Sequence, residues 1–382
     1  MLRIGIIGTG GIADAHIRGY LAFRDECEVV ALADVIPGRA PQKAESFGLA
    51  DAATFDDPLE MIAHADLDVV SIATPPSTHA SLAIAALDAG IHVLVEKPMA
   101  PSLEECDAML AAQERSGRVL SVVAQNRFRD DLAALKDVVD SGLLGSISHV
   151  RVDSAWWRGL PYYDLWWRGT WEKEGGGCTL NHAIHHIDLL LWLLGTPTEI
   201  TAMLANAQHD NAEVEDLSVA IFRYDRGLAQ LTSSVVHHGE EQAIVIQGAD
   251  ARVSQPFSVV AEQSRRDGFP EEGGAPDAVA RIEALVAGRT PLAHLGHEGQ
   301  IGDLIAAIRD SRPPIAGGQD GRNAVEVVTA IYKAGFERQF VSLPIAASDP
   351  YYRAGQLVAH APHFFEKLSL IHISEPTRPL YI

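Results

Sequence analysis

The strongest constraint on the fold of this chain lies near its amino terminus, where a short apolar run meets a glycine-rich turn. Residues 2–7, LRIGII, are almost entirely apolar, and the next segment, GTGGIADAHIRGY, changes to helical spacing. We therefore predict a strand, a glycine turn and a helix. The turn fits the pattern GxGxxA, whose glycines turn the chain and let the backbone approach a pyrophosphate, and whose small third residue lets the helix pack on the strand. The candidate cofactor-binding residues of this turn are Gly8, Gly10, Gly11, Ile12 and Ala13.

A second apolar segment, EVVALAD, ends on Asp34, roughly 20 residues after the turn. An acidic residue at this position hydrogen-bonds the adenosine ribose of a dinucleotide. Because a carboxylate repels a 2'-phosphate, Asp34 favours NAD over NADP. Arg39 follows closely and could hold such a phosphate, or it could be a solvated helix residue, so NADP stays open.

Strands and helices continue to alternate up to residue 124, with the strands DVVSIAT, HVLVEKP and VLSVVAQ between helical segments. This alternation predicts a doubly wound parallel sheet, so we expect a Rossmann cofactor-binding domain over residues 1–124. Such sheets bind ligands at the carboxyl ends of their strands. The candidate cofactor-binding residues there are Thr74, Pro75, His79, Glu96, Lys97 and Asn126. His79 has an alternative interpretation as a surface histidine, whereas a lysine ending a buried strand is costly unless it points into a polar site.

Residues 125–350 contain consecutive strands with short turns between them: EITAMLANA, EDLSVAIFRYD, GLAQLTSSVVHH and EEQAIVIQG. This order predicts an α+β substrate and oligomerisation domain with a largely antiparallel, open sheet. We expect residues 255–298 to be mostly irregular, and helices over residues 299–310 and 321–339 to pack against both domains. A sheet face without helices needs a partner, which predicts a homodimer or homotetramer.

The two ends of the chain and its composition narrow the class of protein. Residues 351–368 are predicted to be a carboxy-terminal extension. Residues 369–382, SLIHISEPTRPLYI, resemble translated sequencing-adapter read-through and are expected to be non-native. No run reaches the roughly 18 apolar residues of a membrane span, and we expect a cytoplasmic protein without a secretion signal. The net charge of −21 disfavours nucleic acid and anionic membranes as partners.

An aromatic segment, AWWRGLPYYDLWWRGTW, follows the first strand of the second domain. Rings in such a segment can anchor a loop on a sheet, and this hypothesis suits at least half of them. Arginines interleaved with rings also suit a polyol or sugar, whose C–H faces stack on rings while guanidinium groups donate to hydroxyls. The candidate substrate-binding residues here are Arg158, Tyr163 and Arg168.

The segment GGGCTLNHAIHHIDLLLWLLG, residues 175–195, places polar residues in an apolar run. If a helix begins near Thr179, then Asn181, His185 and Asp188 share one side of it. A zinc site at His182 and His186 lacks both the HExxH glutamate and an identifiable third ligand. The remaining hypotheses are satisfied core histidines and a general base.

Taken in order, GTGGIADAH, ATPPSTHASLAIAALDAGIHVLVEKPMA and GGGCTLNHAIHHIDLLLWLLG resemble the Gfo/Idh/MocA family of NAD(P)-dependent oxidoreductases over nearly all of residues 1–350. The resemblance implies that the lysine of the EKP motif is Lys97 and that the histidine of the glycine-helix motif is His185. Asp188 matches the aspartate that follows this histidine. Many relatives carry aspartate where this chain has Asn181, and because asparagine cannot accept a proton, the base role falls on His185. His182 and His186 occupy positions that vary in such proteins, and each is assigned a possible substrate contact only.

These observations predict an oxidoreductase that transfers a hydride between a carbinol of a sugar, inositol or sugar derivative and NAD(P). In this account His185 is the general base and Lys97 polarises the reacting oxygen. One alternative is a glycoside hydrolase that uses NAD for transient oxidation, and another is a non-catalytic NAD-binding regulator.

Overall fold

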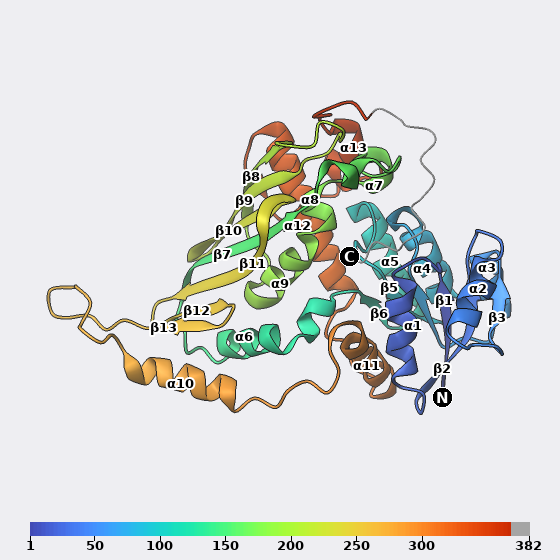
Figure 1. Ribbon diagram of the computed structural model, residues 1–382, viewed down its shortest axis with the longest axis horizontal. Helices are drawn as coiled ribbons and strands as arrows, with labels where there is room; N and C mark the ends of the chain where they lie inside the picture. The colour runs from blue at the N-terminus through green and yellow to red at the C-terminus, as the bar shows by residue number, and fades with distance from the viewer. Residues whose placement is uncertain (368–382) are drawn as a thin grey trace.

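The computed structural model describes residues 1–367, which form two sheets joined by shared helices (Figure 1). The non-native tail predicted for residues 369–382 lies outside the described part of the chain. Within residues 1–367, no helix combines the length and the apolar character needed to cross a bilayer.

The amino-terminal sheet is parallel throughout, with the strand order β3-β2-β1-β4-β5-β6. Its strands are β1 (Leu2–Ile7), β2 (Cys27–Ala33), β3 (Ala53–Phe55), β4 (Val69–Ile72), β5 (His92–Val95) and β6 (Leu120–Val122). The helices between them are α1 (Ala13–Leu21), α2 (Arg39–Ser46), α3 (Pro58–His64), α4 (His79–Asp88) and α5 (Leu103–Ser116), with a short 3-10 turn, η1 (Pro76–Thr78), before α4. The β4 strand is buried along its whole length, as a strand covered on both faces must be. The predicted doubly wound sheet is confirmed.

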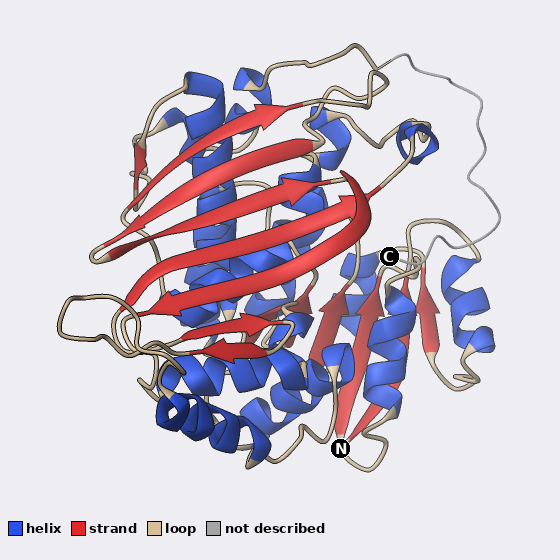
Figure 2. Cartoon of the chain, turned by 60° about the vertical axis from the view of Figure 1, so that its left-hand side comes forward, coloured by secondary structure: helices blue, strands red, loops and turns tan. Residues whose placement is uncertain are grey.

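The carboxy-terminal sheet has the order β13-β12-β11-β7-β10-β9-β8-β14 and is antiparallel except between β7 and β10. Its strands are β7 (Ile147–Trp157), β8 (Glu199–Ala205), β9 (Leu217–Tyr224), β10 (Gly227–Ser234), β11 (Val236–Gly248), β12 (Arg252–Gln255), β13 (Ser258–Val260) and β14 (Val341–Ser342). Burial alternates along β9, which means that one face packs on the core and the other meets solvent. The predicted open, largely antiparallel sheet is confirmed, and Figure 2 shows its broad face with helices behind it and none in front.

The helices of the second half are α6 (Asp130–Asp140), α7 (Trp171–Glu174), α8 (Cys178–Asn181), α9 (Ile184–Leu194), α10 (Pro276–Ala287), α11 (Gly296–Arg309), α12 (Gly318–Glu337) and α13 (Gln356–His360). Three 3-10 turns accompany them: η2 (Gln125–Phe128), η3 (Leu160–Tyr163) and η4 (Pro350–Tyr352). The expectation that residues 255–298 are mostly irregular is wrong for α10, whose proline start and buried Ile282 support a regular amphipathic helix.

Two helices near the carboxyl end of the chain hold the sheets together. The α11 helix packs on α1 and η2, where Ile301, Leu304 and Ile305 join the core around Ile17 and Tyr20. The α12 helix packs on β8 and α9 on one side and on α5 on the other. The segments that follow β5 and β6 line a small cavity together with α9, and this junction positions the candidate site.

Candidate active site

The glycine turn after β1 has space for a ligand beside its backbone. Gly8 has φ +87°, and a Cβ there would lie 2.6 Å from the Ala73 carbonyl oxygen, so only glycine fits. A Cβ at Gly10 or Gly11 would meet no atom within 4 Å. Ile12 is exposed, and the fully buried Ala13 begins α1 close to the sheet. This open turn at a helix N-terminus fits the pyrophosphate of a dinucleotide.

Asp34, at the end of β2, faces the same turn. One carboxylate oxygen accepts hydrogen bonds from the Thr9 amide at 2.9 Å and the Thr9 hydroxyl at 2.7 Å, and the other accepts from the Ile36 amide at 2.9 Å. Burial alone would raise the pKa of Asp34, but these hydrogen bonds and the nearby charge of Arg39 outweigh it and lower the pKa. Asp34 is therefore a fixed carboxylate where a ribose diol would bind, and the residues present fit NAD.

His79, at the start of α4, connects two loops of the site. It is fully buried, so the alternative of a surface histidine is wrong. Its Nδ1 lies 2.9 Å from the Pro98 carbonyl oxygen and its Nε2 lies 2.8 Å from the Thr74 carbonyl oxygen, and a neutral imidazole donates to one of the two at a time. Thr74 also accepts a hydrogen bond from the Thr78 hydroxyl. Cofactor contact by Thr74, Pro75 and His79 stays a prediction.

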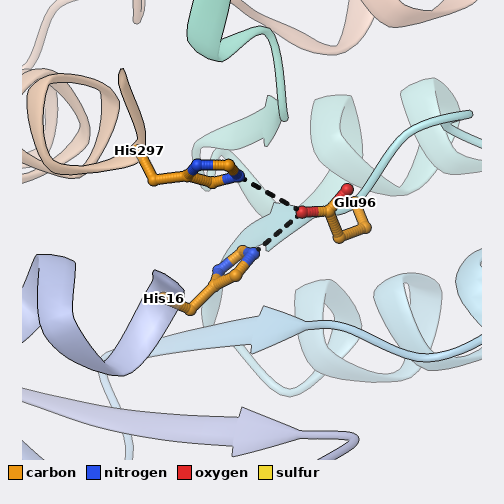
Figure 3. Close-up of side chains that lie close together, drawn as sticks. All are labelled: His16, Glu96 and His297. Atoms are coloured by element: carbon orange, nitrogen blue, oxygen red, sulfur yellow. Dashed lines mark hydrogen bonds and ion pairs between the residues drawn. The ribbon is translucent and has the colours of Figure 1, made fainter. Parts of the chain in front are cut away.

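Glu96 is held between three segments of the chain, as Figure 3 shows. Its Oε1 lies 3.0 Å from Nε2 of His16 on α1 and 3.6 Å from Nε2 of His297 on α11, and its Oε2 accepts a hydrogen bond from the Lys97 amide at 3.1 Å. Burial would raise the pKa of Glu96, but the two histidines and the Lys97 charge outweigh it and hold the pKa well below its usual range. The ionised Glu96 thereby fixes the main chain at Lys97.

Lys97 and His185 line one small cavity, of about 20 Å³, between the end of the parallel sheet and α9. Burial lowers the pKa of Lys97, whose ammonium donates to the Asn181 carbonyl oxygen at 3.4 Å. Burial, followed by the charge of Lys97, holds the pKa of His185 well below its usual range. A neutral imidazole therefore shares a cavity with an ammonium group. The other lining residues are Pro98, Met99, Val122, Val123, Ala124, Ile184, Asp188, Asp320, Gly321 and Ala324. Asn126, predicted as a cofactor contact, lies half-buried in η2, just after this lining.

The helix expected from Thr179 onward is instead two helices. The α8 helix ends at Asn181 and α9 begins at Ile184, so Asn181 does not share a helix with His185 and Asp188. The Asn181 amide group donates to the carbonyl oxygens of Gly176 at 2.8 Å and Gly177 at 3.2 Å. Asn181 thus links the end of α8 to the glycine segment. The spacing of polar residues in the sequence could not reveal this contact.

The glycine segment before α8 packs tightly against other parts of the protein. A Cβ at Gly176 would lie 2.2 Å from the Tyr332 hydroxyl oxygen, and one at Gly177 would lie 1.9 Å from the Glu215 carbonyl oxygen. The buried Glu215 carboxylate accepts hydrogen bonds from the amides of Gly177 and Thr179. Glu215 was missed because it is distant in sequence and no local pattern marks it.

Asp188 is paired with Arg127, which the sequence analysis did not single out. The guanidinium Nε and an Nη donate to the two carboxylate oxygens at 2.9 Å and 2.7 Å, and Arg127 also donates to the Ile315 carbonyl oxygen. This bidentate pair is nearly enclosed and ties η2 to α9. The arrangement supports a positioning role for Asp188, and direct substrate contact stays a prediction.

The aromatic segment brings cations and rings to the same region. Arg168 stacks over Tyr162 at 4.1 Å and over Trp167 at 4.6 Å, while Arg158 pairs with Glu240 at 2.9 Å. Tyr163, predicted to contact substrate, is enclosed between other rings and packs on His209 at 4.8 Å.

The rings of Trp156, Tyr162 and Trp167 are called the aromatic layer below. His182 lies against it, with its ring centroid 5.9 Å from that of Trp156 and 6.0 Å from that of Tyr162. Burial lowers its pKa to about 3, aided by the charges of Arg158, Lys97 and Arg168. Its Nδ1 is buried, and no residue among those described forms a hydrogen bond with it. His182 is therefore a neutral polar group close to Lys97. His186 is also neutral, since burial lowers its pKa to about 4. It lies in the core, but its Nδ1 has no hydrogen-bond partner within residues 1–367, so it is not a fully satisfied core histidine.

Glu174 is a further titratable group that the sequence analysis missed. Burial raises its pKa to about 7, although Arg168 lies 3.6 Å away and the Gly169 amide donates to it at 2.6 Å. A carboxyl group that titrates near neutrality thus lies beside the Arg168 guanidinium. In the sequence Glu174 stands only as a glutamate before three glycines, and this pattern does not indicate that its carboxyl group is buried.

Comparisons with known proteins agree with this arrangement. Residues 2–124 match the model of an oxidoreductase family with an NAD-binding Rossmann fold, and residues 132–254 match the GFO/IDH/MocA C-terminal domain. The D-glucoside 3-dehydrogenase of Escherichia coli (strain K12) is 33% identical over 196 residues, which cover 51% of this chain and 55% of that protein. The chain thus matches about half the length of this relative.

Two other proteins align over most of the chain. The myo-inositol 2-dehydrogenase of Thermotoga maritima is 25% identical over 348 residues, which cover 90% of this chain and 98% of the relative. The WlbA dehydrogenase from Bordetella pertussis, solved in complex with NADH and UDP-GlcNAcA, is 28% identical with a TM-score of 0.76, covering 90% of this chain and 98% of that one. Since both halves are matched by models of one family, the chain belongs to the Gfo/Idh/MocA family of NAD-binding oxidoreductases.

Proposed function

We propose that this protein is an NAD-dependent dehydrogenase that oxidises a carbinol of a sugar, an inositol or a related carbohydrate. The observation that carries the proposal is the cavity shared by Lys97 and His185 at the carboxyl end of the parallel sheet. The names of the relatives, a glucoside dehydrogenase and an inositol dehydrogenase, support the substrate class.

In the proposed reaction His185 removes the hydroxyl proton of the carbinol. Its low pKa keeps the imidazole neutral, so a nitrogen is ready to accept a proton at neutral pH. Lys97 donates a hydrogen bond to the same oxygen and stabilises the alkoxide that develops there. Bound NAD supplies the acceptor for the hydride, and the Gly8–Ala13 turn and Asp34 would hold it.

The aromatic layer supplies the proposed substrate contacts. His182, with its unpartnered Nδ1, and Arg168, with its unpartnered Nε, are buried polar groups that substrate hydroxyls would satisfy. Arg158 stacks over Trp156 and Tyr162, and both Arg158 and Asn181 are kept as candidate contacts. Tyr163 packs behind Tyr162 and supports the layer.

Substitution of the two proposed catalytic residues tests this account. His185→Ala and Lys97→Met should each lower kcat by about 10²- to 10⁴-fold, because general base and electrostatic catalysis contribute this much. NAD affinity, followed by fluorescence titration, should remain within a few-fold of the wild type for His185→Ala. His64→Ala, on the exposed end of α3, is the matched control and should be unaffected. Near-normal turnover in either active-site variant would disprove the assignment.

Two other functions remain as alternatives with distinct outcomes. A hydrolase that uses NAD transiently would form product without net NAD reduction, and a regulator would bind NAD without turnover. The proposed cytoplasmic location and homo-oligomeric state rest on the sequence features described above.

A further inference from the structure

His16, Glu96 and His297 form a cluster that the proposed reaction does not use as a whole. The three residues come from α1, the end of β5 and the first turn of α11, and Figure 3 shows both rings directed at the same carboxylate oxygen. One ligand atom from each lies within 4.8 Å of the others. Among residues 1–367, this is the group of histidine, cysteine and acidic side chains close enough together to hold a metal ion.

Hydrogen bonds alone leave this cluster incompletely paired. His16 Nε2 lies 3.0 Å from Glu96 Oε1, which is a normal hydrogen bond. His297 Nε2 lies 3.6 Å from the same oxygen, beyond hydrogen-bond distance, and this buried atom has no hydrogen-bond partner in the described part of the chain. Because a buried nitrogen without a partner destabilises the folded state, an additional group between the rings and the carboxylate would be favourable.

The spacing and donor types fit a metal ion as that group. Bonds of about 2.0–2.2 Å in a tetrahedral site place neighbouring ligand atoms about 3.3 Å apart. Glu96 Oε1 lies 3.0 Å and 3.6 Å from the two ring nitrogens, on either side of this spacing, and all three ligand atoms lie within 4.8 Å of one another. Two imidazoles and one carboxylate are a ligand set that binds zinc and other divalent first-row metals, and leave a fourth position open for water. The second oxygen of Glu96 is already fixed by the Lys97 amide, which orients Oε1 toward the rings.

We propose that His16, Glu96 and His297 bind a divalent transition-metal ion of the zinc class. The side chain of His297 is 20% exposed, whereas those of His16 and Glu96 are 0% and 8% exposed, so the ion would enter along α11. Binding would join three segments that are distant in sequence, and it would fix α11 to the residue that precedes Lys97. The site is separate from the histidine pair His182 and His186, for which the described residues supply no third ligand.

Titration of the full-length protein with Co²⁺ tests the proposal, after removal of any affinity tag and dialysis against a chelator. Visible d–d absorption bands should saturate at one ion per chain, and the unfolding temperature should rise with Co²⁺ concentration, because an ion that binds the folded state stabilises it. Neither readout requires turnover, so a failure here is distinguishable from a failure of the dehydrogenase assignment.

Variants locate the ion within the structure. His297→Ala removes the least buried ligand and should weaken Co²⁺ binding by at least roughly 100-fold, since loss of an outer-shell partner alone costs about 10- to 100-fold. Glu96→Gln keeps the side-chain volume and should have the same effect. His294→Ala is the matched control, because His294 lies on the same segment and pairs with Glu298 instead. Absence of the bands in the wild type, unchanged affinity in His297→Ala, or equal loss in His294→Ala would overturn the proposal.

Discussion

At the scale of single residues, the proposed reaction depends on the charge state of His185. An imidazole acts as a base only when it is neutral, and burial together with the Lys97 ammonium makes its protonated form unfavourable. Both effects lower the pKa of His185. The pH of the solution must therefore fall further than for an ordinary histidine before the imidazole is protonated and can no longer act as a base.

The pH dependence of oxidation should show this shift. For an unperturbed histidine, kcat/KM would fall as the pH drops through about 6.5. Here the fall should occur at a clearly lower pH, because His185 remains neutral below that value. The measurement is a kcat/KM profile with saturating NAD, using His64→Ala to confirm that a surface histidine does not contribute. An acidic limb centred at or above 6.5 would contradict the role given to His185.

Individual residues also show where prediction from the sequence succeeds. Gly8, Asp34 and Lys97 belong to local patterns, and the structure places all three at the carboxyl ends of parallel strands, where the doubly wound fold requires them. Arg127, Glu174 and His297 are functional candidates only through contacts with residues far away in sequence, such as Arg127 with Asp188. No local spacing encodes such contacts, and so the sequence alone could not identify them.

At the scale of elements, the two glycine segments perform different tasks. The turn after β1 leaves open space beside Gly10 and Gly11, whereas Gly177 is pressed against Glu215. Both segments are glycine-rich in sequence, and only the packing around them distinguishes a ligand cradle from a close protein contact. The break between α8 and α9 was unpredictable for the same reason, since the apolar pattern continues through it.

Alanine substitutions should separate these two tasks. Gly177→Ala should destabilise the protein by about 1–3 kcal/mol or more, because its Cβ would overlap the Glu215 carbonyl oxygen. Gly11→Ala should leave stability nearly unchanged and weaken NAD binding. Chemical denaturation and NAD titration of both variants provide the measurements. A stable Gly177→Ala protein, or unaltered NAD affinity in Gly11→Ala, would contradict this division.

At the scale of the whole molecule, no helix of residues 1–367 covers the outer face of the carboxy-terminal sheet (Figure 2). Met203 on β8 pairs directly with Val219 on β9, and both are exposed, as are Ile221 and Leu228 nearby. An exposed apolar patch of neighbouring strands favours association with a second copy of the chain.

Light scattering should therefore give a dimer or tetramer for the wild type. Ile221→Glu should shift the protein toward monomer, because it introduces a charge at the centre of this face. Phe269→Glu, at an exposed apolar position outside the sheet, should leave the assembly unchanged. A monomeric wild type, or an Ile221→Glu protein with the wild-type mass, would contradict the predicted interface.

The most direct test of the central claim is the stoichiometry of NAD reduction. Purified protein is incubated with NAD and, in turn, with inositols, aldoses, glucosides and sugar acids, while reduced nicotinamide absorbance and the oxidised sugar are both quantified. The account predicts one NADH for each carbinol oxidised with at least one of these compounds, and loss of both signals in His185→Ala. Sugar conversion without NADH, or NAD binding with no reduction across the whole panel, would contradict it.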